Sequence, residues 1–225
     1  MHQSIGKKNK IAIYLIFLVI LSTTSGKFLE QPKKYSLKIN KIEVTGLSNE
    51  KNAEIKNDLN NIFYQNIFLL GKEEIQKIMN KYNIIEEYNI KKIYPSTINI
   101  KVRPTKFLAK VSSGRQPIVG SNGKLIYSES NDEILPYIFG EFNSKEFLKF
   151  KKKIELSNLN FNEFKTVYFF PSNRWDVLTI DNILIKLPKH NILESLNLAH
   201  KIITNDQFKD KNVIDLRIKK HLIIK

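Results

Sequence analysis

Residues 94–103 read YPSTINIKVR, and this stretch decides the fold of the chain around it. After the turn at its start, Ile98, Ile100 and Val102 alternate with polar residues. Because successive side chains of a strand point to opposite faces, this alternation predicts a strand with one face covered and the other in water. The apolar face requires neighbouring elements that bury it.

The segments before this strand are expected to supply that cover. Residues 42–44, Ile-Glu-Val, predict a first strand that ends in a turn at Gly46. One helix is expected to begin near Ser48, whose hydroxyl can cap it, and a second near Lys72. Residues 39–103 thus predict the order β-α-α-β-β, with the apolar loop 66–71 filling the gap between helices and sheet. The core-facing helical positions are Ile55, Leu59, Ile62, Phe63, Ile75, Ile78, Met79 and Tyr82.

The chain after Pro104 predicts a second domain built mainly from short strands. Asn122-Gly123 is a strong hairpin signal, because both residues tolerate positive φ. Helices are expected at residues 144–156 and 191–204, and closing strands at 213–218 and 222–224. The predicted class is therefore α+β. It consists of an N-terminal membrane anchor, a β-α-α-β-β domain over residues 37–105, and a mostly antiparallel β domain with two helices over residues 106–225.

An uncharged segment, residues 11–26, lies between Lys10 and Lys27 and begins with an unbroken apolar run. As a helix these 16 residues are roughly 24 Å long, which is short for a hydrocarbon core of about 30 Å. A cleaved signal peptide therefore competes with the uncleaved anchor that we favour, and a buried helix fits least because the run has no polar face. The preceding lysines are expected to keep residues 1–10 as a short cytoplasmic tail, with residues 27–36 as a linker. The expected anchor includes Ile11, Leu15, Phe17, Leu18 and Leu21.

The formal net charge of +15 raises the question of an anionic partner. The lysines are dispersed along the whole chain, which favours general surface charge over a nucleic-acid footprint. An exported basic protein that binds an anionic polymer, either nucleic acid or an envelope polymer, is the alternative. The absence of cysteine from the sequence excludes disulfides, thiolate metal sites and a cysteine nucleophile.

The sequence contains no residue pattern that predicts catalysis. His2, His190, His200 and His221 are scattered, with no pair at metal-ligand spacing. Hydrolase and phosphate-loop motifs are missing, and the acidic pairs are sequence neighbours whose side chains diverge. We expect no enzyme, no cofactor, no metal ion and no small-molecule substrate.

The order of these parts, together with several motifs, resembles the bacterial cell-division family FtsQ/DivIB. Residues 42–46 (Ile-x-Val-x-Gly), 66–69 (Asn-Ile-Phe-Leu) and 94–102 are similar to the POTRA domain, which the family shares with outer-membrane assembly and secretion proteins. In the second domain, residues 174–178, 185–188 and 214–217 (RWDVL, IKLP and IDLR) are similar to FtsQ specifically.

The resemblance implies a single-pass scaffold of the bacterial inner membrane at the division septum, with its C-terminal domains in the periplasm. Such proteins join FtsB and FtsL, recruit later divisome components and help control septal cell-wall synthesis. FtsB binds family members by adding a strand to a sheet edge near the C-terminus. No nucleic-acid partner is expected.

Strand addition is also favoured by a physical argument, because a final strand with no covering element has unpaired N–H and C=O groups. An edge of the first sheet, at residues 41–45 or 98–102, is a second candidate docking surface. The candidate partner-binding residues are Val213, Ile214, Asp215, Leu216, Arg217, Ile218, His221, Leu222, Ile223 and Ile224, with Arg174 and Trp175 nearby. For Trp175, a core or hairpin anchor is the alternative that we favour.

Overall fold

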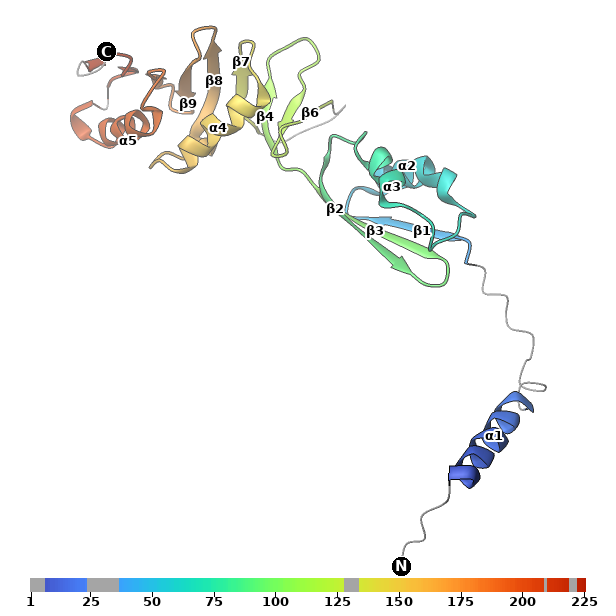
Figure 1. Ribbon diagram of the computed structural model, residues 1–225. Helices are drawn as coiled ribbons and strands as arrows, with labels where there is room; N and C mark the ends of the chain where they lie inside the picture. Colours follow the sequence, from blue (N-terminus) through green and yellow to red (C-terminus); the bar gives the residue numbers. More distant parts are fainter. Residues whose placement is uncertain (1–6, 24–36, 128–133, 209, 219–221) are drawn as a thin grey trace, which may run out of the picture.

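The computed structural model describes residues 7–23, 37–127, 134–208, 210–218 and 222–225. The chain forms helix α1 (Lys7–Thr23) and two sheets, each with helices on one face (Figure 1). The three-stranded sheet is formed by residues 41–104 and the nine-stranded sheet by residues 107–224. This content confirms the α+β class.

Helix α1 includes the apolar run, and every large apolar side chain from Ile11 to Leu21 is exposed. The anchor positions Leu15, Phe17 and Leu18 are each 58–64% exposed. Within the described residues, no helix combines the length and the apolar character needed to cross a membrane. Residues 24–26 of the expected anchor and the expected linker, 27–36, lie outside the described residues.

The first sheet has the strand order β1-β3-β2. Strand β1 (Lys41–Thr45) is parallel to β3 (Thr97–Pro104), and β2 (Ile85–Ile93) is antiparallel to β3. The alternating side chains of β3 behave as predicted, because Ile98, Ile100 and Val102 are all buried. Since β3 is the central strand, residues 98–102 are not a sheet edge, and only β1 and β2 have open sides.

Two helices lie above this sheet in Figure 1, α2 (Asn49–Asp58) and α3 (Lys72–Met79), and a 3₁₀ turn, η2 (Leu59–Ile62), follows α2. The Ser48 hydroxyl accepts a hydrogen bond from the Lys51 amide and caps α2 as expected. The loop 66–71 fills the core only in part. Ile67 and Leu70 are buried, whereas Phe68 and Leu69 are 57% and 83% exposed.

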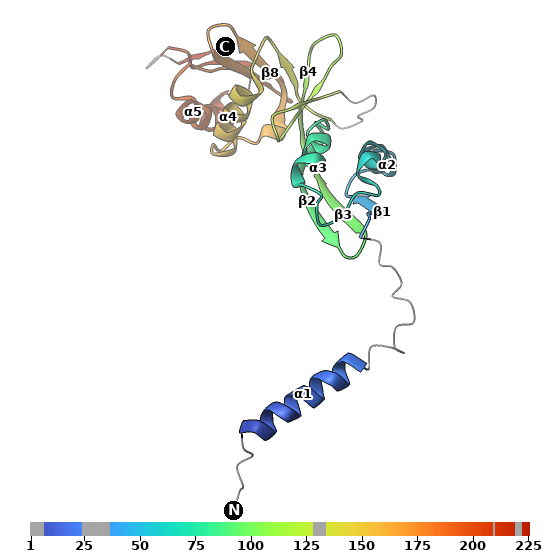
Figure 2. The same ribbon diagram turned by 45° about the vertical axis from the view of Figure 1, so that its right-hand side comes forward.

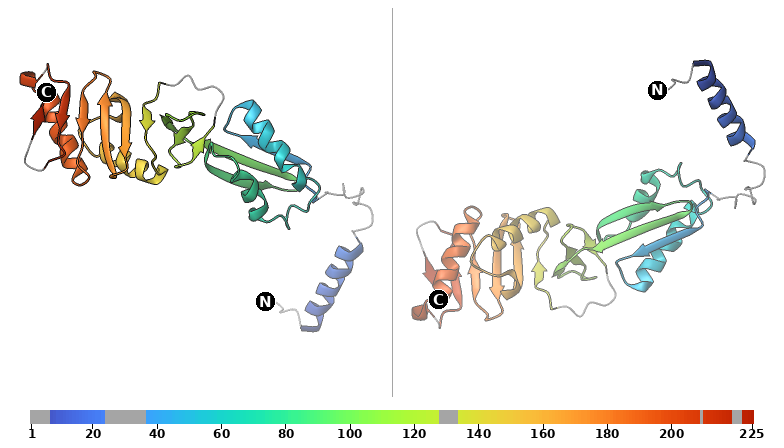
Figure 3. Two further views of the ribbon diagram at one scale, coloured as in Figure 1. Left: turned by 90° about the horizontal axis from the view of Figure 1, so that it is seen from above. Right: turned by 90° about the horizontal axis from the view of Figure 1, so that it is seen from below.

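The second sheet has the order β12-β11-β10-β9-β8-β7-β4-β5-β6, and three of its eight strand pairs are parallel. Figure 3 shows its strands following one another away from the first sheet, with the C-terminus at the far end. The bounds are β4 (Phe107–Val111), β5 (Ile118–Gly120), β6 (Leu125–Ile126), β7 (Tyr137–Phe139), β8 (Phe164–Phe170), β9 (Arg174–Thr179), β10 (Leu184–Lys186), β11 (Val213–Asp215) and β12 (Ile223–Ile224).

One face of the second sheet is covered by α4 (Ser144–Glu155) and α5 (Ile192–Ile203) (Figure 2). Short 3₁₀ turns occur at η3 (Phe161–Glu163) and η4 (Asp206–Phe208). Side chains from both helices and from the inward face of the strands form one continuous core. Its central members are Phe147, Phe150, Val167, Trp175, Val177, Ile185, Leu196 and Ile214.

A hydrogen-bonded joint connects the two sheets at the β5–β6 turn. The Asn122 side-chain amide donates to the backbone carbonyls of Asn83 and Ile85, at 2.8 and 2.9 Å. The Glu86 carboxylate accepts from the hydroxyls of Thr105 and Ser121, each at 2.8 Å. The β5–β6 turn of the second sheet is therefore held directly against residues 83–86 at the end of the first.

Candidate partner-binding edge

The last two strands occupy different positions in the sheet. Strand β11 is paired on both sides, in parallel with β10 and antiparallel with β12. This pairing corrects the expectation that residues 213–218 provide an open edge, because the backbone groups of Val213, Ile214 and Asp215 are already used in the sheet. Strand β12 is the terminal strand, and no described strand lies on its outer side.

The hydrogen bonds of β12 show which backbone groups point outward. The Lys225 amide donates to the Val213 carbonyl at 3.0 Å, and the Val213 amide donates back to the Lys225 carbonyl at 3.1 Å. In an antiparallel pair, every second residue exchanges hydrogen bonds with the neighbouring strand in this way. The N–H and C=O groups of the residues between them point away from that strand. The N–H and C=O of Ile224 therefore point away from β11, toward the position that a further strand would occupy.

The side chains along this edge are apolar and partly uncovered. Leu222 and Ile223 are 44% and 42% exposed, and Ile218 is 59% exposed. Ile224 is half-buried and packs against the core on the helix side of the sheet. A strand added to β12 would therefore meet apolar side chains on both faces of the sheet.

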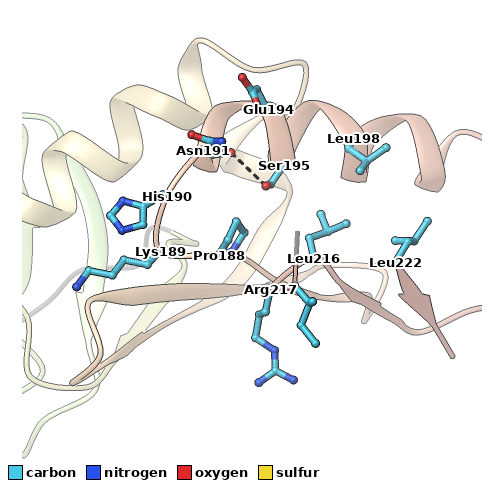
Figure 4. Close-up of a pocket in the computed structure, with 11 residues that line it drawn as sticks. Pro188, Lys189, His190, Asn191, Glu194, Ser195, Leu198, Leu216, Arg217 and Leu222 are labelled. Carbon is cyan, nitrogen blue, oxygen red and sulfur yellow. Dashed lines mark hydrogen bonds between the residues drawn. The ribbon is translucent and has the colours of Figure 1, made fainter. Parts of the chain in front are cut away.

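Next to this edge, a pocket of about 680 Å³ lies between α5 and the ends of β11 and β12 (Figure 4). In Figure 4, Leu198 of α5 and Leu222 point toward one another across it. The α5 side is closed by Asn191, whose carbonyl accepts a 3.1 Å hydrogen bond from the Ser195 hydroxyl. None of Leu198, Asn191 and Ser195 was among the sequence candidates. The available signal was Leu198 itself, an apolar residue outside the core-facing stripe of its helix.

An ion pair holds the chain where it leaves β11. Arg217 Nε donates to the two carboxylate oxygens of Asp215 at 2.8 and 3.0 Å, and Nη2 lies 2.5 Å from Oδ2. The hydrogen bonds from Arg217 lower the pKa of Asp215. Arg217 is thus already paired within the chain, and although the residue borders the pocket, Figure 4 shows its guanidinium pointing away from α5.

Arg174 and Trp175 do not lie at this edge. Both are in β9, and β10 and β11 separate them from β12, a distance of roughly 14 Å at the usual strand spacing. Trp175 is 4% exposed, so its side chain belongs to the core and we exclude it from the partner surface. Arg174 contacts its own chain, with Asp176 at 3.2 Å and its guanidinium 4.3 Å from the centre of the Phe170 ring. Burial raises the pKa of Asp176, and Arg174 opposes that rise.

The remaining candidates divide into buried and undescribed positions. Ile214 and Leu216 are buried at 2% and 7% exposure, so their side chains face the core. His221 lies outside the described residues. The residues that the structure brings together at the accessible edge are Ile218, Leu222, Ile223 and Ile224, with Arg217 beside them.

Two family models match the chain, one in the region of each sheet. Residues 37–103 match the POTRA domain, FtsQ-type, and residues 109–217 match the C-terminal domain of the cell division protein FtsQ/DivIB. The chain belongs to the FtsQ/DivIB family. No curated protein matches the sequence closely enough to count as a relative.

FtsQ/DivIB proteins are non-enzymatic scaffolds of cell division and components of the septal membrane divisome, so the role of this FtsQ-type chain lies in division. Among the residues that the structure describes, no three histidine, aspartate or glutamate side chains are grouped so that they could hold a metal ion.

Proposed function

We propose that this FtsQ-type protein is a single-pass membrane scaffold of the divisome that binds FtsB, together with FtsL, by strand addition to β12. The observation that carries the proposal is the position of β12 at the end of the sheet, with the backbone of Ile224 pointing outward. An unpaired edge of this kind can accept an extended segment through main-chain hydrogen bonds.

The side chains beside the edge support specificity. A partner strand alternates its side chains between the two faces of the sheet, so one set would meet the pocket beside Leu198 and Leu222. The other set would lie beside Ile223 on the opposite face. Because apolar contacts surround a strip of backbone hydrogen bonds, the edge can select a partner by side-chain shape.

Membrane attachment is the second part of the proposal. The unbroken apolar run 11–21 of α1 supports an uncleaved anchor within residues 11–26, with residues 1–10 in the cytoplasm and residues 27–36 as a linker. Residues 37–105 and 106–225 would then be periplasmic domains at the septum of the inner membrane. Through the partner strand, the scaffold would help recruit and control septal cell-wall synthesis.

The test is to measure FtsB binding by full-length Ile224→Pro and Ile224→Thr variants in detergent. Proline removes the outward N–H, whereas threonine keeps it and loses a similar amount of apolar contact with the core. We expect proline to reduce affinity at least tenfold, about 1.4 kcal/mol, and threonine to reduce it much less. If both variants bind FtsB like the wild type, β12 is not the docking edge. Circular dichroism melting of both variants separates a binding effect from unfolding.

A further inference from the structure

The POTRA domain concentrates its exposed large apolar side chains at one end. Residues 37–105 are all described, and within them every exposed large hydrophobic side chain comes from three short segments. We call this group the apolar tip. It consists of Leu37, Tyr64, Phe68, Leu69, Ile93 and Tyr94, which are 41–83% exposed.

Backbone and ring contacts join the three segments. The Ile67 amide donates to the Leu37 carbonyl at 2.8 Å, and the Tyr64 amide donates to the Ile39 carbonyl at 2.9 Å. The ring of Phe68 stacks on that of Tyr94, with 4.7 Å between centroids and 20° between planes. The tip is therefore a continuous patch supported by the fold. Separately scattered residues would need no explanation, but a joined apolar patch indicates a contact surface.

The tip lies at the end of the domain that the chain reaches from α1. Leu37 is the first described residue after α1, and the 13 residues of 24–36 separate it from Thr23. Even fully extended, that length places Leu37 within roughly 50 Å of the end of α1. Strand β3 runs from the tip toward Pro104 and the second sheet, so β12 lies at the opposite end of the molecule (Figure 1).

Lysines predominate in the segments that carry the tip, and the carboxylates beside them are Glu43, which pairs with Lys41, and Glu73 and Glu74 at the start of α3. Residues 37–41, 64–72 and 91–97, which include the tip segments, contain five lysines and no aspartate or glutamate. These are Lys38, Lys41, Lys72, Lys91 and Lys92. Lysines around exposed tyrosine, phenylalanine and leucine are typical of surfaces that lie at the interface of an anionic bilayer, where aromatic rings occupy the headgroup layer.

We propose that the apolar tip rests on the surface of the anionic membrane in which α1 is anchored. The proposal depends on the membrane attachment proposed above. Contact at the tip would place the POTRA domain against the bilayer and direct the nine-stranded sheet, with its partner edge, away from the membrane.

The absence of cysteine from the sequence allows a direct test with single spin labels in the full-length protein. Leu69→Cys reports on the tip, and Leu15→Cys reports on α1. Asn80→Cys, an exposed position at the end of α3 that lies farther from the tip, is the control. Each variant is placed in phosphatidylcholine nanodiscs with or without phosphatidylglycerol, and its collision rates with oxygen and a water-soluble nickel chelate are measured.

We expect the ratio of the oxygen collision rate to the nickel collision rate to be several-fold higher for the Leu69 label than for the Asn80 label. This difference should be larger when phosphatidylglycerol is present. Phe68→Ser together with Tyr94→Ser should abolish the difference, because both rings are exposed and their loss leaves the core intact. A Leu69 label as accessible to nickel as Asn80, with Leu15 protected, overturns the tip contact and leaves membrane anchoring in place. Nickel access at both Leu69 and Leu15 overturns anchoring as well.

Discussion

The ring of Trp175 lies parallel to the ring of Phe150, with 4.7 Å between the centroids and 6° between the planes. This stack joins β9 to α4, and Phe169 packs on the same tryptophan with 4.5 Å between centroids. The single tryptophan therefore holds a helix on the sheet. Its neighbour Arg174 lies on the opposite, helix-free face, because successive residues of a strand alternate.

Trp175→Ala should lower the free energy of unfolding by roughly 3–5 kcal/mol, because it leaves a large cavity beneath α4. Trp175→Phe keeps much of the aromatic contact and should cost clearly less. Urea unfolding followed by circular dichroism measures both, since the variants lack the fluorescent residue. FtsB binding by Trp175→Phe should equal that of the wild type, and a selective loss of binding would instead assign Trp175 to the partner surface.

The pair formed by Asp215 and Arg217 predicts a pH-dependent contribution to stability. The hydrogen bonds from Arg217 lower the pKa of Asp215 in the folded protein below the unfolded value of about 3.9. The stabilisation is therefore complete above that value and is lost as the pH falls through the folded-state pKa.

Asp215→Asn should reduce the free energy of unfolding by about 1–2 kcal/mol at pH 7, a modest amount because Arg217 is partly in water. The deficit should shrink as the pH falls below about 4. Urea titrations at several pH values measure it, and Asp210→Asn, at an exposed position, is the control. A deficit that does not change with pH would exclude the ion pair as its cause.

Gly46 follows β1 in a backbone conformation with φ of 113°. A Cβ atom there would lie 1.8 Å from the Val102 carbonyl oxygen on the neighbouring strand, a contact that requires the backbone to move. Gly46→Ala should therefore destabilise the POTRA domain by at least about 2 kcal/mol. Gly114→Ala is the matched control, because nothing lies within 4 Å of its added Cβ. Thermal melting compares the two, and equal melting temperatures would contradict the predicted clash.

Asn122 is expected to limit the movement between the two sheets, together with the Glu86 contacts of the same joint. Asn122→Ala removes the hydrogen bonds to the carbonyls of Asn83 and Ile85 and should cost about 1–3 kcal/mol. It should also broaden the distribution of distances between spin labels placed at Lys56→Cys and Lys201→Cys. Pulsed electron paramagnetic resonance measures that distribution. Asn162→Ala, at an exposed position, is the control and should leave the distance distribution unchanged. An unchanged distribution in Asn122→Ala would show that the joint does not restrain the domains.

Local patterns were enough to predict several elements and the family. The alternation at Ile98, Ile100 and Val102 and the cap at Ser48 depend only on residues close in sequence, because strand periodicity and capping are local effects. The motifs around residues 42–46, 94–102 and 174–178 indicated FtsQ/DivIB, and both family models match there.

The sequence offered both residues 213–218 and residues 222–224 as docking strands, and it could not tell which of the two has an open side. Partner binding at this edge stays a prediction. Strand β11 pairs with β10 although α5 lies between them in the sequence. The central position of β11 therefore depends on contacts between segments distant in sequence. The pocket beside Leu198 likewise forms from a helix and two strands that meet only in the folded chain.

The sequence by itself therefore determined most of the strands, the helix starts, the absence of disulfides and the family, because these depend on residue type and short-range spacing. It did not predict the short strand β7. Only the tertiary structure decided that β12 is the edge, that Trp175 is buried, and that Phe68 and Leu69 point outward while Ile67 and Leu70 point inward. The physical reason is that burial and strand pairing depend on which distant backbone and side-chain groups the fold brings into contact.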